Sequence, residues 1–372
     1  MMIDPRLEKL AKNLVNYSCS VKKGEKVWID ASGIGYEFPA ILAREVYRAG
    51  GYPFVYQTDP RVKREIMMGA DESYWEILRD RDKAFMEQMD AYIGIRGGQN
   101  NFELSDVPVK NTQQYSSIYA EAVHHNIRVK KTKWVILRYP TEGMSQLSKT
   151  STERFEDFYF NVCNLDYQKM SNAMDALVDL MNRTDKVRIV AKDTDITFSI
   201  KDIPSVKCDG KHNIPDGEVY TAPVRDSVNG VITYNVGSIE HGILFENVRL
   251  EFKDGKIIKA TANFTDKINE IFDTDEGARY IGEFSLGLNP YIENPMGDIL
   301  FDEKIAGSIH FTPGACYEDA YNGNKSAVHW DLVQVHTEKY GGGEIWFDGT
   351  LVRKNGLFVI DELKYLNPEY LK

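Results

Sequence analysis

Residues 27–56 decide the fold of this chain, and they read VWIDASGIGYEFPAILAREVYRAGGYPFVY. The stretch opens with an apolar run at 27–30, continues with a helical pattern over 38–49 and ends with a second apolar run at 54–56. Pro39 is compatible with the first turn of the helix, where its missing N–H is not needed. A strand, a helix and a strand in this order form the unit from which parallel sheets are built.

Two further apolar runs, YIGI at 92–95 and WVIL at 134–137, extend this pattern, with helical segments between them. Short runs as apolar as these are typical of strands that helices cover on both faces. A helical stretch over about 152–182 closes this half of the chain. We therefore expect residues 1–185 to form an N-terminal α/β domain with a largely parallel sheet.

The sequence pattern changes after residue 185. Ile196, Phe198 and Ile200 alternate with polar residues, as in a half-buried strand. Tight-turn dipeptides beside strand-like sequence predict β-hairpins. These dipeptides are Asn229-Gly230, Asp254-Gly255, Asp348-Gly349 and Asn355-Gly356. With one helix over 266–280, residues 186–372 are expected to form a C-terminal mixed α+β domain rich in β-hairpins.

The composition excludes several classes of protein. The 372 residues carry 45 basic against 56 acidic side chains, a net charge of −11 that argues against nucleic-acid binding. Most of the acidic excess follows residue 185, which suits cation binding. The 4 cysteines are far apart, which indicates neither a thiolate zinc site nor a disulfide framework. We expect a cytoplasmic protein without a signal peptide and without membrane contact, because no long apolar run occurs.

His329 and Asp331 are the first candidates for chemistry. They lie in the strand-like run SAVHWDLVQV, and residues i and i+2 of a strand project from the same face. An imidazole and a carboxylate side by side are a good pair of metal ligands. The same pair also fits a hydrogen-bonded structural role, and the sequence around it leaves both interpretations open.

Other metal-binding residue types surround this pair in the sequence. Each lies beside a turn or near the end of a strand-like run, and together they are Glu218, Glu283, Glu303, His310 and Tyr317. Two histidines with this many oxygen donors exceed what one zinc ion needs. The set suits two metal ions that share a bridging carboxylate. Spacing alone does not show that these side chains meet.

Four segments of the chain resemble one known family. They are MIDPRLEKLAKNLVNYS at 2–18, NIPDGEVYTAPVRDSVNG at 213–230, TDEGARYIGEFSLGLNP at 274–290, and LFDEKIAGSIHFTPGACY at 300–317 followed by NGNKSAVHWD at 322–331. In these segments the sequence resembles the aminopeptidase T family of metal-dependent aminopeptidases, also called aminopeptidase II. The resemblance spans essentially the whole chain.

The resemblance implies a role for individual residues. The positions that match the family's metal site are Glu218, Glu283, Glu303, His310, Tyr317, His329 and Asp331. Two departures from the family pattern lie in the ligand-bearing segments: Asn322 replaces a common glycine, and Phe311-Thr312-Pro313 replaces a small apolar stretch. They bear on substrate preference more than on metal binding.

The implied reaction is hydrolysis of the N-terminal peptide bond of peptides with a free N-terminus, by a water that two divalent ions per chain activate. Zinc is expected first, and cobalt, manganese or magnesium also fit the donors. Glu218 or Glu283 would move the proton to the leaving amine, and Tyr317 would ligate a metal or stabilise the oxyanion. The resemblance also implies a homodimer whose second domain carries the metals.

Two alternative functions stay open. His310, His329 and Asp331 have the composition of a mononuclear iron site, and some relatives of the family resemble ring-cleaving dioxygenases of dihydroxypyridine type. Such a site would not need the additional glutamates and the tyrosine. A non-catalytic, metal-stabilised binding protein is the other alternative. Structural zinc sites are rich in cysteine, and no cysteine is expected among these donors.

Overall fold

The chain folds into two compact units. The computed structural model describes residues 4–100 and 102–372, so the first residues of the segment quoted at 2–18 lie outside the described residues. The first unit holds the chain up to Asn164 with Gly210–Pro215, and the second holds Leu165–Asp209 with Asp216–Lys372. The chain first passes from one unit to the other after Asn164, which is earlier than the boundary expected near residue 185. The reason is that α8 (Tyr167–Arg183) packs on strands of the second unit.

The first unit has a parallel sheet in the order β2-β1-β3-β4-β8, and every neighbouring pair in it is parallel. Its elements are α1 (Pro5–Lys12), η1 (Asn13–Ser18), β1 (Lys26–Ser32), α2 (Glu37–Arg48), β2 (Tyr52–Thr58), α3 (Pro60–Gly69), α4 (Glu72–Met86), β3 (Ala91–Arg96), α5 (Val109–Gln114), η2 (Tyr115–Val129), β4 (Lys133–Arg138), α6 (Glu142–Leu147), α7 (Thr152–Cys163) and β8 (Asn213–Ile214).

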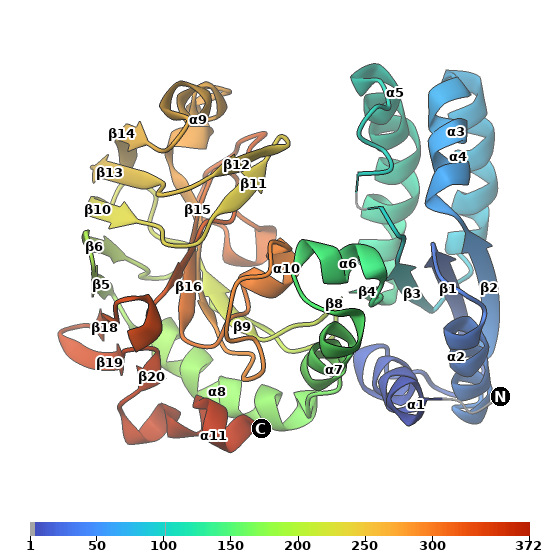
Figure 1. The fold of residues 1–372 in the computed structure, drawn as a ribbon, viewed down its shortest axis with the longest axis horizontal. Coiled ribbons are helices and arrows are strands. Elements are labelled where there is room, and N and C mark those ends of the chain that lie inside the picture. Colours follow the sequence, from blue (N-terminus) through green and yellow to red (C-terminus); the bar gives the residue numbers. More distant parts are fainter. Residues whose placement is uncertain (1–3, 101) are drawn as a thin grey trace. The chain divides into compact units, whose positions relative to one another are not determined.

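Helices cover both faces of this sheet, with α1 and α2 on one face and α3, α4 and α5 on the other (Figure 1). Trp28 and Tyr92 project from β1 and β3 into a buried cluster that includes Trp75 of α4 and Tyr119 of η2. The four apolar runs of the first half are the strands β1 to β4, so the expected parallel α/β arrangement is confirmed. The two-residue strand β8 was not expected.

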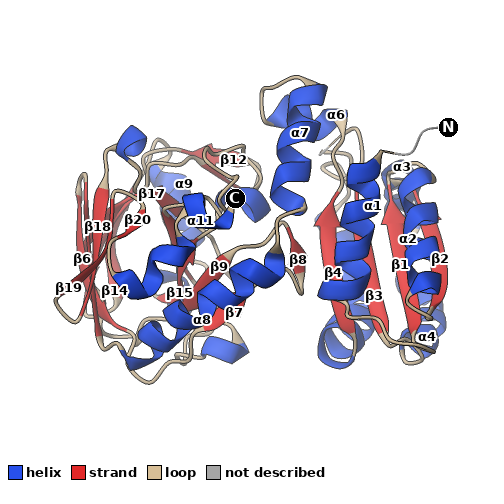
Figure 2. Cartoon of the chain, turned by 90° about the horizontal axis from the view of Figure 1, so that it is seen from below, coloured by secondary structure: helices blue, strands red, loops and turns tan. Residues whose placement is uncertain are grey.

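The second unit is built from antiparallel sheets (Figure 2). Besides α8, its elements are β5 (Lys186–Ala191), β6 (Thr194–Ser199), β7 (Val206–Cys208), β9 (Glu218–Thr221), β10 (Asn229–Thr233), β11 (Ser238–Glu240), β12 (Ile243–Phe245), β13 (Arg249–Lys253), β14 (Lys256–Thr261), α9 (Thr265–Phe272), η3 (Glu276–Arg279), β15 (Ile281–Gly287), α10 (Ile299–Asp302), β16 (Ser308–Pro313), η4 (Glu318–Ala320), β17 (Val333–Val335), η5 (Glu338–Tyr340), β18 (Gly343–Phe347), β19 (Thr350–Lys354), β20 (Leu357–Phe358), η6 (Asp361–Leu366) and α11 (Pro368–Leu371).

One sheet of the second unit has the order β14-β13-β10-β6-β5-β18-β19-β20, and another has the order β17-β16-β15-β9-β7. In the second of these sheets, Phe284 of β15 and Phe311 of β16 share one face and pack against Phe198 of β6, with ring centroids 5.0 Å from Phe198 in each case. Aromatic packing therefore joins the two sheets. Because side chains alternate along a strand, Glu283 and His310 point to the opposite face.

Three of the four expected tight turns are found. Asp254-Gly255 joins β13 to β14, Asp348-Gly349 joins β18 to β19, and Asn355-Gly356 joins β19 to β20. The prediction for Asn229-Gly230 was wrong, because these residues open strand β10. A Cβ at Gly230 would lie 2.2 Å from Asp195 O, so the glycine serves a close approach between strands.

The helix expected over 152–182 is divided into α7 and α8. Asn164 ends α7, and the side chain of Asp166 accepts a hydrogen bond from Lys169 N, which starts α8. The helix expected over 266–280 is likewise shorter, with α9 followed by η3. Among the helices of the described chain, none is long and apolar enough to cross a membrane.

We predict that Phe284→Ala lowers the free energy of unfolding of the second unit by about 3–5 kcal/mol, because it opens a cavity where the two sheets meet. Phe284 is fully buried, whereas Phe264 is 51% exposed and serves as the matched control. Phe264→Ala should cost less than about 1 kcal/mol. Urea denaturation followed by circular dichroism measures both, and equal losses would contradict the packing described.

Candidate metal centre

Three neighbouring strands carry the first ligand candidates. Glu218 opens β9, Glu283 lies in β15, and His310 lies in the middle of β16, and all three are buried. In the antiparallel register Ser285 pairs with His310, and Gly287 pairs with Glu218. Cross-strand partners lie on the same face of a sheet. The three side chains therefore gather on the face opposite the phenylalanines.

His329 and Asp331 reach the same place from a loop. The prediction that both lie in a strand was wrong: they precede β17, and His329 forms only an isolated bridge with Gly314. The segment is nevertheless extended, so the two side chains project together, with His329 Nε2 3.4 Å from Asp331 Oδ1. Thr312 donates a 2.7 Å hydrogen bond to the same Asp331 oxygen.

Glu283 lies at the middle of the cluster. Its Oε1 is 3.0 Å from His310 Nε2, and its Oε2 is 3.4 Å from His329 Nε2. Glu218 Oε2 lies 3.4 Å from His310 Nε2 and accepts a hydrogen bond from Ser285. Two triplets with ligand atoms within 4.8 Å of one another thus share Glu283: one with Glu218 and His310, the other with His329 and Asp331.

Glu303 also joins the cluster, and its neighbour Lys304 was missed by the sequence interpretation. A carboxylate oxygen of Glu303 lies within 4.8 Å of ligand atoms of His310 and Asp331. Lys304 is 1% exposed, and its Nζ lies 2.9 Å from Glu218 Oε1 and contacts Glu303 Oε1. The signal in the sequence was a charged triplet, DEK at 302–304, between two apolar stretches.

The glycine at 287 lets this charged turn approach the sheet. A Cβ at Gly287 would lie 2.4 Å from Ile305 O and 2.9 Å from Glu303 O. Any larger residue would push the backbone of Glu303 and Lys304 away from β15. The position of the buried ammonium therefore depends on a residue that has no side chain of its own.

Tyr317 lies at the edge of the cluster. Its ring is 4.8 Å from the His329 ring and 5.5 Å from the Tyr220 ring, measured between centroids. The residue is 48% exposed, unlike the buried carboxylates. Partial burial, followed by the charge of Glu283, raises the pKa of its hydroxyl, so Tyr317 remains a hydrogen-bond donor at neutral pH.

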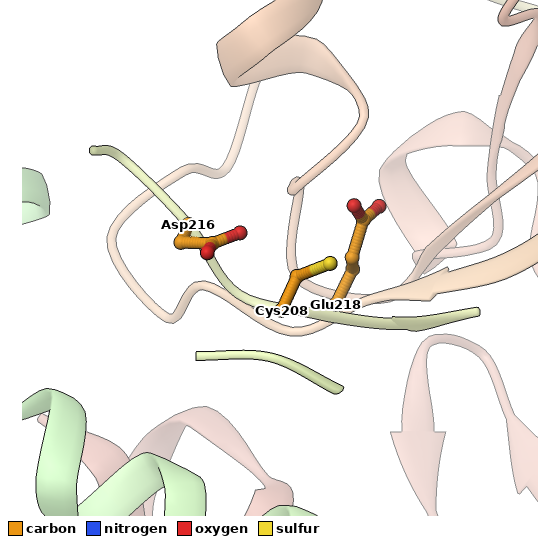
Figure 3. A group of neighbouring side chains, drawn as sticks. All are labelled: Cys208, Asp216 and Glu218. Atoms are coloured by element: carbon orange, nitrogen blue, oxygen red, sulfur yellow. The ribbon is translucent and has the colours of Figure 1, made fainter. Parts of the chain in front are cut away.

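A cysteine lies closer to the cluster than the sequence indicated. Cys208 of β7 pairs with Glu218 in the register, and Asp216 completes a third group with ligand atoms within 4.8 Å. Figure 3 shows the Cys208 sulfur and the Asp216 carboxylate directed toward Glu218. Burial, followed by the charge of Glu218, raises the pKa of the Cys208 thiol well above its ordinary value, so the thiol stays protonated.

The acidic surroundings hold the two histidines in their charged form when no metal is bound. Burial alone would lower the pKa of His310, but Glu218 and Glu283 outweigh it and raise the pKa to about 10. Burial also opposes the charge on His329, but Asp331 and Glu283 raise its pKa to about 11. Burial raises the pKa of Glu303 to about 8. Burial would lower the pKa of Lys304, but Glu218 and Glu303 raise it well above its ordinary value.

The donor set fits divalent metal ions. His329 Nδ1 donates to Ala315 O at 2.7 Å, which in the neutral ring leaves the lone pair on Nε2. Nε2 is buried, makes no hydrogen bond and faces carboxylate oxygens of Glu283 and Asp331. Buried carboxylates around an unpartnered imidazole nitrogen form a mixed nitrogen and oxygen site that suits zinc and similar ions.

We predict that Zn²⁺ binding to the metal-free protein releases protons and that the affinity rises as the pH is raised from about 7 to 9. The raised pKa values of His310 and His329 keep both rings protonated in this range, and a ligand imidazole must be neutral. Calorimetry in buffers of different ionisation enthalpy measures the protons released. His125→Ala, which removes an exposed histidine of η2, should change nothing. A buffer-independent enthalpy would contradict the prediction.

Most of the chain is similar to known proteins, both in sequence and in structure. Residues 3–352 match the family described as thermophilic metalloprotease (M29). Among relatives, Aminopeptidase T of Thermus thermophilus is 23% identical over 396 aligned residues, which cover 92% of this chain and 95% of the relative. Wild-type AmpT from Thermus thermophilus has a similar structure, with a TM-score of 0.77, 22% identity and coverage of 96% of this chain and 99% of that chain.

A second solved structure has the same fold at lower similarity. The 2,5-dihydroxypyridine dioxygenase from Pseudomonas putida KT2440 matches with a TM-score of 0.62 and 14% identity, over 98% of this chain and 100% of that chain. At this identity the likeness concerns the fold alone. The family match, by contrast, extends over most of the sequence, and we conclude that the chain belongs to the thermophilic metalloprotease (M29) family.

Proposed function

We propose that this protein is an aminopeptidase that hydrolyses the N-terminal peptide bond of peptides with the help of two divalent metal ions. The observation that carries the proposal is the position of Glu283, whose two oxygens face two different histidines. A carboxylate in this position suits a bridge between two ions. The relatives named aminopeptidase give the substrate class.

The ligands divide into two groups around the bridge. We assign Glu218 and His310 to one ion, and His329 and Asp331 to the other, with Glu283 shared and Glu303 beside both. Divalent ions held there would supply an acidified water as nucleophile and Lewis acidity toward the scissile carbonyl. Zinc is the first ion to test, because the set combines imidazole with carboxylate. Cobalt, manganese and magnesium are the further candidates.

The remaining groups would handle protons and charge. Because both oxygens of Glu283 face histidines, we assign the bridge to Glu283 and the transfer of a proton to the leaving amine to Glu218. Tyr317 would donate a hydrogen bond to the oxyanion that develops on the substrate, which is worth roughly 3 kcal/mol at comparable sites. Its partial exposure beside His329 is compatible with contact to a substrate.

The contacts favour this proposal over a mononuclear iron dioxygenase. A single ion at His310, His329 and Asp331 would leave the buried charges of Glu218 and Glu283 without a function. The likeness to the dioxygenase structure concerns the fold and adds nothing for the site. A purely structural metal site is also disfavoured, because such sites are usually closed, whereas Tyr317 at the edge of this cluster is 48% exposed.

We predict that His329→Ala and Glu283→Gln each lower hydrolysis of aminoacyl anilides by at least about 100-fold and reduce the bound metal, because each removes a proposed ligand. Metal content is measured by elemental analysis and activity with free and N-acetylated substrates. The acetylated substrates should not be cleaved by any variant. His125→Ala should keep full metal content and activity. Full activity in both ligand variants would overturn the proposal.

We also propose that the protein works as a homodimer in the cytoplasm. The four free cysteines are compatible with a reducing compartment. Strand β2 is an edge of the parallel sheet, and four of its side chains are exposed and apolar or aromatic: Tyr52, Phe54, Val55 and Tyr56. An edge of this kind is suited to pairing with a second copy.

Light scattering after gel filtration should therefore give the mass of two chains. Val55→Lys should shift the protein toward the monomer, because a charge on an edge strand opposes pairing. Ile77→Lys on α4, at a position that is 74% exposed, is the control and should leave the dimer intact. A wild-type monomer would contradict the proposed dimer.

A further inference from the structure

Lys304 places a permanent positive charge among the ligands of the centre. Its Nζ donates a 2.9 Å hydrogen bond to Glu218 Oε1 and contacts Glu303 Oε1, and its side chain is 1% exposed. A buried ammonium is stable only when it is paired, and here both partners belong to the proposed metal ligands. Lys304 therefore shares its partners with the metal ions.

The contacts of Glu218 are divided between its two oxygens. Oε1 accepts from Lys304, whereas Oε2 accepts from Ser285 at 3.1 Å and lies 3.4 Å from His310 Nε2. Only Oε2 thus faces the histidine, so Glu218 can meet an ion through one oxygen. In the described part of the chain, no lysine or arginine forms an ion pair with the carboxylates of the other triplet: Asp331 accepts from the neutral hydroxyl of Thr312, and His329 donates to a backbone carbonyl.

We infer that Lys304 makes the two metal positions unequal, so that the ion held by Glu218, Glu283 and His310 binds more weakly than the ion held by Glu283, His329 and Asp331. The inference rests on the proposed two-metal function and deepens it. Two effects act in the same direction. The ammonium competes for Glu218, and it would repel a divalent cation held by that carboxylate.

The charges around the centre explain why a lysine is tolerated there. Four carboxylates belong to the cluster: Glu218, Glu283, Glu303 and Asp331. Two divalent ions and the hydroxide that they would supply would carry three positive charges in total, one fewer than the negative charges of the four carboxylates. Lys304 supplies the missing charge. It thereby holds Glu218 and Glu303 in place even before an ion binds.

The same charge argues against a third ion beside the centre. Cys208, Asp216 and Glu218 have ligand atoms close enough to hold a metal (Figure 3). Glu218, however, is already engaged by the Lys304 ammonium. Lys304, and not a third ion, therefore compensates the negative charge of Glu218.

The test is calorimetric titration of the metal-free protein with Co²⁺ and Zn²⁺, together with the absorption spectrum of the cobalt form, which reports on each site without catalysis. We compare wild type with Lys304→Gln, which keeps a hydrogen-bond donor, and with Lys304→Met. Wild type should bind two ions in separate steps. Both variants should tighten the weaker step by at least about tenfold and leave the stronger step unchanged. Lys354→Gln, which removes an exposed ion pair with Glu344, should change neither step.

Equal affinities of the two steps in wild type, or a weaker step that does not tighten in either variant, would overturn the inference. If Lys304→Met folds poorly without metal, Lys304→Gln carries the comparison. One ion in wild type and two in Lys304→Gln would support the inference in its strongest form. Failure of the proposed function is seen separately, as two bound ions without cleavage of aminoacyl anilides.

Discussion

Mutual repulsion among buried carboxylates is the constraint on which the centre depends. Glu218 and Glu283 are buried on one face of the sheet, and Glu303 and Asp331 approach them from adjoining segments, where they are partly exposed. Charges of the same sign at this spacing are tolerated only when cations lie between them. The two histidines and the lysine serve this requirement, and divalent metal bound there would serve it too. Without metal, it is met by protonated imidazoles.

The sheet that carries three of the proposed ligands has one apolar face and one polar face. Phe284 and Phe311 on one face fasten it to the neighbouring sheet, and Glu283 and His310 on the other face the ligand cluster. In each strand, a residue that packs between the sheets is therefore adjacent to a residue that faces the ligand cluster. Rigid aromatic packing one residue away limits the movement of each ligand, as a site that must hold its geometry requires.

Much of this arrangement could be predicted from local sequence. The strands β1 to β4 are short apolar runs between helical patterns, and three glycine-containing turns mark hairpins, because both signals depend on neighbouring residues alone. The ligand residues were identified as candidates by residue type and by a family resemblance. Their convergence could not be predicted from spacing, because it depends on the register between β15 and its neighbours over many residues.

The elements and residues that the sequence analysis misplaced or missed also depend on features that local sequence patterns do not reveal. His329 and Asp331 lie outside a regular strand, because the chain pairs with Gly314 at a single point before β17 begins. Lys304 was not singled out from the charged triplet at 302–304. Its burial depends on the missing side chain of Gly287, which lies far from it in the sequence. Strand β8 has two residues and therefore no periodicity that could be recognised.

The path of the chain has a practical consequence for anyone who wishes to isolate the unit that carries the proposed metal centre. The segment Gly210–Pro215 leaves the second unit and supplies β8 to the parallel sheet beside β4, and the chain returns to the second unit at Asp216, only two residues before Glu218. A fragment that starts at Leu165 would carry this strand without the sheet it completes. Neither unit can be excised by a single cut, because each is made of two separate segments of the chain.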